Sequence, residues 1–161
     1  TNHRVVFKRQ KLGDIGMNLG FYIDSQTQSE TTNKIYNTLN SLIDDNKVDN
    51  ANLFYNDIDY NPITPKFGCF NSTDVWYFTG TLIITSIKNA LSLGKVINKF
   101  KPFFLYDKEK NSALELISIS NQMPVIAQSQ EDADYIKRVT GVESKVLQDG
   151  KIENVIGVIH E

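Results

Sequence analysis

The sequence contains few of the residues on which several classes of protein depend. It has one cysteine, Cys69, and two histidines, His3 and His160, among 161 residues. A single cysteine excludes an internal disulfide and a cysteine-rich zinc site, so the thiol content does not require an oxidising compartment. No apolar run approaches the roughly 18 residues of a membrane-spanning helix, and no secretory leader is recognisable. We therefore expect a cytoplasmic protein without a membrane span.

Charge of one sign is also scarce. The 17 Lys and Arg residues are balanced by 19 Asp and Glu residues, which gives a formal net charge of −2. So balanced a chain creates no field that would hold a polyanion, and binding of duplex nucleic acid by bulk charge is not expected. No motif calls for a metal or a cofactor, and none is predicted. The length is typical of one domain with its own core, so we expect residues 1–161 to form a single domain.

Short apolar runs alternate with segments of helical periodicity along most of the chain. This alternation is typical of βαβ units around a mainly parallel sheet. The predicted strands are residues 19–23, 51–55, 75–78, 102–106, 124–127 and 145–147. Ser129 and Asp132 have the spacing of a helix N-cap and its third helical residue. The pattern predicts a three-layer, doubly wound, Rossmann-like α/β fold with about six mainly parallel strands.

Three segments carry more specific expectations. Residues 1–16 are interpreted as an added antiparallel edge strand or a hairpin. The connection after residue 57 is expected to be irregular, because Pro62 and Pro65 remove backbone donors and fix φ. The aromatic run Trp76, Tyr77 and Phe78 is expected to pack in the core as part of a central strand.

Polar or small residues follow most of the predicted strands. Ligands of open parallel sheets bind beyond the carboxyl ends of the strands, where loops and helix N-termini converge. Asp24 and Asp107 follow different strands and are the candidate catalytic carboxylates, for acid/base work or for ordering sugar hydroxyls. The candidate ligand-binding residues are Ser25, Thr27, Thr79, Gly80, Thr81 and Ser129. For each of these residues a turn or a helix cap is the competing explanation.

The sequence Thr79-Gly80-Thr81 is the most informative of these sites. Gly80 would let the backbone approach a ligand, and Thr81 with the amides that follow it would form a helix N-terminus suited to an anion. Neither the P-loop motif nor the dinucleotide-binding fingerprint is present. We expect a ligand or anion to lie near Thr79, Gly80 and Thr81, within reach of Asp24 or Ser25.

The order of features in residues 74–140 resembles the amino-terminal half of a two-domain GT-B glycosyltransferase. The shared features are a strand ending in a small turn at residues 79–81, an apolar helix, a strand ending in a polar loop at residues 107–109, and a strand followed by the helix-capping loop at Ser129. The resemblance implies a sugar or nucleotide-sugar ligand and the acceptor side of a sugar-transfer cleft. In that family a second domain holds most of the donor. With 161 residues the chain has no room for it, so we expect a fragment that is not catalytically complete alone and that a second domain or a homo-oligomer would complete.

Two other function classes remain open. Ser25, Gln26 and Thr27 are similar to the hydroxyl-rich phosphate loop of flavodoxins, although Gln28 replaces the glycine of that loop. This similarity implies a flavin or nucleotide binder. The third class is a non-catalytic interaction module, which would need an exposed apolar patch, because a fold by itself does not determine a function. The sequence leaves open whether the chain is an enzyme.

Overall fold

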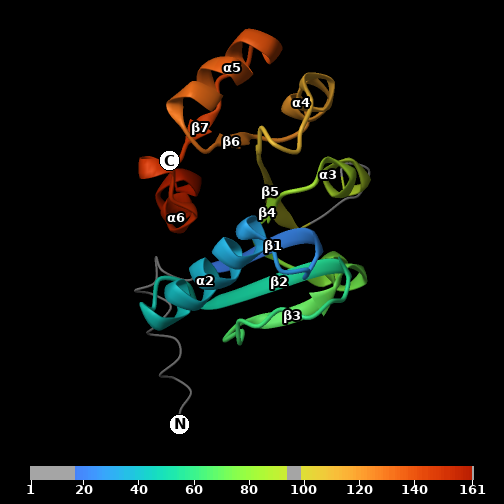
Figure 1. Ribbon diagram of the computed structural model, residues 1–161, viewed down its shortest axis with the longest axis vertical. Helices are drawn as coiled ribbons and strands as arrows, with labels where there is room; N and C mark the ends of the chain where they lie inside the picture. The colour runs from blue at the N-terminus through green and yellow to red at the C-terminus, as the bar shows by residue number, and fades with distance from the viewer. Residues whose placement is uncertain (1–16, 94–98, 161) are drawn as a thin grey trace.

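A computed structural model of the chain describes residues 17–93 and 99–160. Its centre is a seven-stranded sheet in the order β3-β2-β1-β4-β5-β6-β7 (Figure 1). The strands are β1 (Asn18–Ser25), β2 (Asn50–Asp57), β3 (Gly68–Asn71), β4 (Gly80–Ile84), β5 (Phe100–Leu105), β6 (Val125–Ala127) and β7 (Lys145–Val146). All pairings between these strands are parallel. The predicted doubly wound, mainly parallel α/β fold is therefore confirmed.

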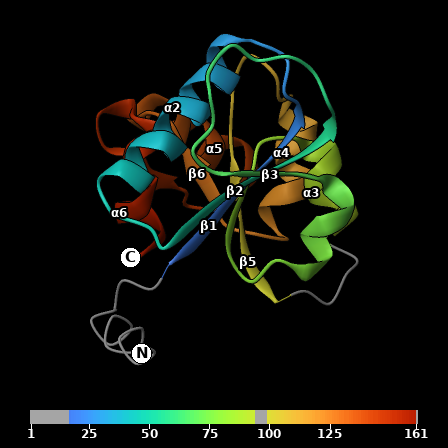
Figure 2. The same ribbon diagram turned by 90° about the horizontal axis from the view of Figure 1, so that it is seen from below.

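Helices cover both faces of the sheet (Figure 2). On one face lie α2 (Glu30–Asp44) and α6 (Val155–Ile159), and on the other lie α3 (Ile87–Leu93), α4 (Ala113–Ser120) and α5 (Gln130–Thr140). Two short 3₁₀ helices, η2 (Gln148–Gly150) and η3 (Ile152–Asn154), lead into α6. Successive residues of β1 pack against opposite helix layers. Phe21 belongs to the core cluster with α2 and α6, and Tyr22 belongs to the cluster with α3, α4 and α5. Burial on both faces explains why the central strands are apolar at nearly every position.

The helix termini follow the sequence signals. The Ser129 hydroxyl accepts a hydrogen bond from the N–H of Asp132 at the start of α5, as predicted. The same helix ends at Gly141, whose φ of 77° is the left-handed conformation that favours glycine. Ser29 caps α2 in the same way as Ser129 caps α5. These caps fix where each helix begins at the carboxyl ends of β1 and β6.

The predicted strand at residues 75–78 is wrong. Residues 75–77 belong to the 3₁₀ helix η1 (Ser72–Tyr77), and Phe78 is its C-cap. The N-cap is Asn71, whose side chain accepts a hydrogen bond from the N–H of Thr73. Trp76 is 55% exposed and Tyr77 is 84% exposed, so their predicted place in the core is also wrong, although Phe78 is buried. Local side-chain capping has overridden the β propensity of the aromatic run. The strand β3, in turn, lies within the connection that was predicted to be irregular.

This correction moves Thr79, Gly80 and Thr81 to the opposite edge of the sheet. Gly80 and Thr81 open β4 and Thr79 directly precedes it, so all three lie at the amino end of this strand. Asp24 and Ser25 lie at the carboxyl end of β1. Gly80 has a φ of 138°, and a Cβ at this position would lie 2.4 Å from the carbonyl oxygen of Asn18. The glycine is therefore required by the close approach of β4 to β1.

Two further expectations concern the ends of the chain and the membrane. The predicted edge strand or hairpin at residues 1–16 lies outside the described residues. Among the helices of the described residues, none is long and apolar enough to cross a membrane.

We expect Gly80→Ala to lower the free energy of unfolding by at least about 1–3 kcal/mol, because the left-handed conformation penalises a side chain and the new Cβ would meet the Asn18 backbone. Gly157→Ala is the matched control, because a Cβ on that helical residue meets no atom within 4 Å. The control should be neutral or stabilise by up to about 1 kcal/mol. Urea unfolding measures both. A Gly80→Ala variant as stable as the parent would contradict this explanation of the glycine.

Candidate functional site

The order of the strands reverses between β1 and β4. The chain winds outward from β1 through β2 to β3, and then from β4 through β5 and β6 to β7. The loops after β1 and β4 therefore leave the sheet in opposite directions and open a crevice between them. We call the side of the sheet where β1, β4, β5 and β6 end the carboxyl edge. Three neighbouring cavities lie along it.

The first cavity, which we call the switch cavity, lies at this reversal and has a volume of about 190 Å³. Its polar lining residues include Asp24, Ser25, Thr27, Thr31, Thr85 and Lys110. Ser25 ends β1 and Thr27 follows it, Thr85 follows β4, and Lys110 comes from the loop after β5. The structure thus brings three of the predicted site residues, Asp24, Ser25 and Thr27, into one cavity.

The hydroxyl-rich loop after β1 is held by its own hydrogen bonds. Thr27 Oγ1 donates to Asp59 at 2.7 Å and lies 2.7 Å from Ser25 Oγ, which also accepts the N–H of Thr27 at 3.1 Å. Hydrogen bonds from Thr27 and from the N–H of Tyr60 lower the pKa of the Asp59 carboxyl. The Thr27 proton is therefore engaged with a carboxylate, an arrangement unfavourable for a phosphate group.

Asp24 belongs to a polar network at the ends of β1 and β2. Asn56 Nδ2 donates to Asp24 Oδ1 at 3.4 Å and to Asn89 Oδ1 at 2.8 Å, while the Tyr22 hydroxyl donates to Asn56 Oδ1 at 3.0 Å. Burial raises the pKa of Tyr22, so this phenol stays protonated as a donor. Within the described residues the buried Nδ2 of Asn89 has no hydrogen-bond partner. The network orients one carboxylate oxygen of Asp24.

The second cavity, the bridge cavity, has a volume of about 320 Å³ and contains Asp107 and Ser129. Asp107 lies at the end of β5, so β4 separates it from Asp24. At about 4.8 Å per strand, the ends of β1 and β5 are about 10 Å apart. The structure thus places the two predicted catalytic carboxylates in neighbouring cavities and not against each other. One oxygen of the Asp107 carboxylate also accepts the N–H of Glu109 at 2.9 Å.

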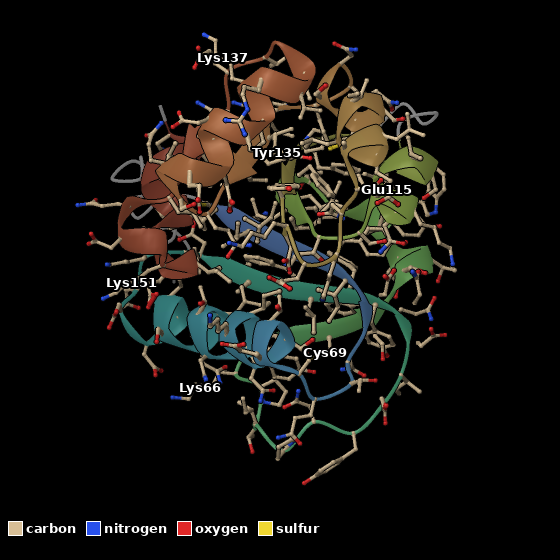
Figure 3. The ribbon with its side chains drawn as sticks, turned by 45° about the horizontal axis from the view of Figure 1, so that its top comes forward. Lys66, Cys69, Glu115, Tyr135, Lys137 and Lys151 are labelled. Carbon is tan, nitrogen blue, oxygen red and sulfur yellow. The ribbon has the colours of Figure 1, made fainter. Side chains whose placement is uncertain are left out.

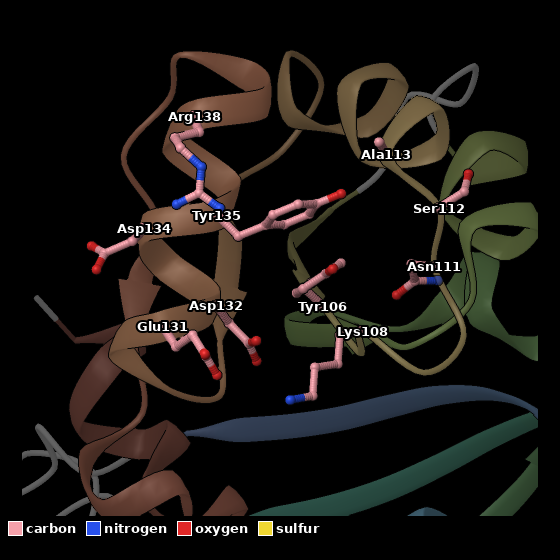
Figure 4. Close-up of a pocket in the computed structure, with 10 residues that line it drawn as sticks. All are labelled: Tyr106, Lys108, Asn111, Ser112, Ala113, Glu131, Asp132, Asp134, Tyr135 and Arg138. Atoms are coloured by element: carbon pink, nitrogen blue, oxygen red, sulfur yellow. The ribbon is translucent and has the colours of Figure 1, made fainter.

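The third and largest cavity, the tyrosine cavity, has a volume of about 730 Å³ (Figure 4). It lies between α5 and the loop joining β5 to α4. Tyr135 points from α5 across the cavity toward this loop, on the side of α5 that faces α4 (Figure 3). The Tyr135 and Tyr106 rings are stacked, with centroids 6.3 Å apart and planes 21° apart. The Arg138 guanidinium lies 5.7 Å from the Tyr135 ring centroid, within the range of a cation–π contact.

The charges around the tyrosine cavity are mixed. Its lining contains the cationic residues Lys108 and Arg138 and the acidic residues Glu131, Asp132 and Asp134. Asp132 is only 8% exposed, and its burial raises the pKa of the carboxyl, an effect that Lys108 opposes and Glu131 reinforces. A lining with both signs of charge offers hydrogen-bond donors and acceptors without attracting a polyanion.

Sequence reasoning missed most of the tyrosine cavity. Tyr106 was assigned to a strand, and Asp132 was identified only as a capping position. Tyr135 and Arg138 lie three residues apart on α5, outside the apolar positions 133 and 136, and nothing in the periodicity marks a cavity beside them. Thr85 could have been found, because it follows the apolar run of β4 as Asp24 follows that of β1. Within the described residues no group of three or more His, Cys, Asp or Glu residues is arranged to hold a metal ion.

These features define a Rossmann-like, parallel α/β protein with polar cavities along its carboxyl edge. The chain matches no protein-family model and no curated protein. The functional conclusion therefore depends on the geometry of the cavities and the chemistry of their residues.

We expect the difference in the free energy of unfolding between the parent and the Asp132→Asn variant to depend on pH. Because the folded pKa of Asp132 is raised, the folded state holds its proton more tightly than the unfolded state does. The free energy of unfolding of the parent, relative to the variant, should therefore fall as the pH rises from about 4 through the folded pKa, and then level off. Urea unfolding at a series of pH values measures it. A difference that is constant from acid to neutral pH would contradict the raised pKa.

Proposed function

We propose that the carboxyl edge binds a carbohydrate and forms the acceptor side of a sugar-transfer cleft. The observation that carries this proposal is the tyrosine cavity, in which stacked aromatic rings lie beside carboxylate, amide and cationic side chains. Its volume of about 730 Å³ is within the range of small-molecule sites, about 300–1,000 Å³.

The chemistry of this cavity is complementary to a sugar ring. A sugar presents C–H groups on the faces of its ring, and these suit the electron-rich face of an aromatic side chain. Its hydroxyl groups both donate and accept hydrogen bonds, so they need partners of both kinds. Asp132 offers acceptor oxygens, Lys108 offers donors, and the Asn111 side chain offers an amide.

A nucleotide or a flavin is less well matched. The loop after β1 directs the hydroxyl of Thr27 to Asp59, whose negative charge would repel a phosphate. In the tyrosine cavity the acidic side chains Glu131, Asp132 and Asp134 offset the positive charges of Lys108 and Arg138, which leaves no excess positive charge to hold a diphosphate. Both observations favour a neutral, hydroxyl-rich ligand.

The predicted site residues take different places in this proposal. Asp24 and Ser25 in the switch cavity, and Asp107 and Ser129 in the bridge cavity, are placed to order hydroxyl groups of the ligand. A transferase would still require a donor-binding partner, because one domain can orient only one of the two reactants. The site at Gly80 and its neighbours receives no support, since those residues open β4 at the other edge of the sheet.

We expect Tyr135→Ala to weaken binding of a recognised sugar by about tenfold, because it removes the aromatic platform. Tyr77→Ala is the matched control, since Tyr77 is exposed and lies outside the three cavities. Titration calorimetry with a panel of linear oligosaccharides measures both variants against the parent. Equal losses in the two variants would place the ligand elsewhere.

We expect the isolated chain to release nucleotide from nucleotide sugars more slowly than about 1 per second, even with an acceptor present. The assay incubates the chain with a panel of nucleotide sugars and candidate acceptors and follows nucleotide release. Asp107→Asn is the control for any turnover observed. Turnover at or above this rate that is lost in the control would show that the chain suffices for catalysis.

A different observation favours an interaction module as the second candidate function. The exposed aromatic residues Phe70, Trp76 and Tyr77 gather on β3 and η1, beside a groove of about 380 Å³ that Phe70 and Tyr77 help to line. Exposed apolar patches of this kind mark protein interaction sites. Sedimentation of the parent and of a Trp76→Ser, Tyr77→Ser variant over a range of concentrations tests whether this surface holds two copies together.

A further inference from the structure

We propose that the carboxyl edge takes a linear oligosaccharide of about three sugar units, laid from the tyrosine cavity through the bridge cavity to the switch cavity. This inference rests on the proposed carbohydrate function and specifies its substrate class. It depends on the lining residues that neighbouring cavities share, the combined length of the three cavities and the rigidity of their common wall.

Each cavity shares lining residues with the next one along the carboxyl edge. Lys108 and Asp132 line both the tyrosine cavity and the bridge cavity. Thr31, near the start of α2, lines both the bridge cavity and the switch cavity. A ligand laid along the carboxyl edge would therefore meet neighbouring polar side chains from Tyr135 at one end to Thr85 at the other.

One loop forms a wall of all three cavities. Residues 107–112, between β5 and α4, place Asn111 and Ser112 in the tyrosine cavity, Asp107 in the bridge cavity and Lys110 in the switch cavity. A single segment thus meets the ligand along its whole path.

Internal hydrogen bonds hold this loop in shape. The carbonyl of Asp107 accepts the N–H groups of Lys110 and Asn111 at 3.0 and 2.9 Å, and the Asn111 side chain accepts the N–H of Asp107 at 2.9 Å. Ser112 and Glu115 form the capping box that begins α4. A wall that is already ordered loses little conformational freedom when a ligand binds.

The length of the path sets the length of the ligand. The path runs from the end of β1 past β4 and β5 to α5, which follows β6. Three inter-strand steps of about 4.8 Å give about 14 Å. One pyranose ring with its bridging oxygen spans about 5 Å, given bonds of about 1.5 Å. About three units therefore fill the path.

The lining of the cavities also indicates which cavity takes the first sugar unit of the oligosaccharide. The tyrosine cavity is the largest and has the aromatic platform, so a monosaccharide should bind there first. The bridge and switch cavities are smaller and each contains several hydroxyl, carboxylate and ammonium groups, so they add hydrogen bonds to the second and third units.

The test is calorimetric titration of the chain with linear glucose and N-acetylglucosamine oligomers, from monosaccharide to hexasaccharide. For the series that binds, affinity should rise by about tenfold per unit up to the trisaccharide and then stay constant. Equal affinity for monosaccharide and trisaccharide would overturn the oligosaccharide path and leave the carbohydrate function standing. Absence of binding at every length in both series would overturn the proposed function, and the path with it.

Two variants locate the path. Tyr135→Ala should weaken binding of all lengths by a similar factor, because every ligand uses the tyrosine cavity. Thr31→Val keeps the side-chain shape but removes the hydroxyl at the junction, so it should leave the monosaccharide unaffected and reduce the gain on lengthening. Thr64→Val, at an exposed threonine outside the three cavities, is the matched control. A Thr31→Val variant with the parent's length dependence would contradict the path through the bridge cavity.

Discussion

The parallel pairing of β1 with β2 on one side and with β4 on the other is the constraint on which the rest of the structure depends. It places β1 in the middle of the sheet, buried on both faces. It also requires the chain to return to the centre after β3 and to wind outward in the other direction. The crevice at the carboxyl edge is the consequence of this reversal, and no side chain of the crevice has to create it.

The same pairing makes the amino ends and the carboxyl ends of the strands structurally different. At the amino edge the backbones of β1 and β4 approach so closely that Gly80 cannot carry a side chain. At the carboxyl edge the loops diverge, and their polar side chains have room for a ligand. The capping residue Ser129 begins a helix at this edge and also lines the bridge cavity, so helix caps and cavity walls are built from the same few short loops.

The fold could be predicted from the sequence because each correct strand is an apolar run bounded by a turn or a cap. The failure at residues 75–78 has a local cause. The aromatic run resembles a strand, but Asn71 begins a 3₁₀ helix there, and the apolar residues of β4 have spacings that also suit a helix. The residues after β1, β5 and β6 were placed at the correct edge, since a strand end shows in the sequence. The tyrosine cavity could not be predicted, because it depends on the distance in space between α5 and the loop after β5, which the sequence pattern does not give.

β1 is made before β4, the strand that pairs with one of its two edges. β1, β2 and β3 emerge first and can pair among themselves, but the second edge of β1 waits for β4, as the pairing of Leu19 with Thr81 shows. Until then an apolar strand exposes an open edge, which is the kind of surface that pairs wrongly with other chains. Sheets whose strands pair across long separations in the sequence fold slowly. The edge of β1 that pairs with β4 therefore stays unpaired until residues 80–84 have been made.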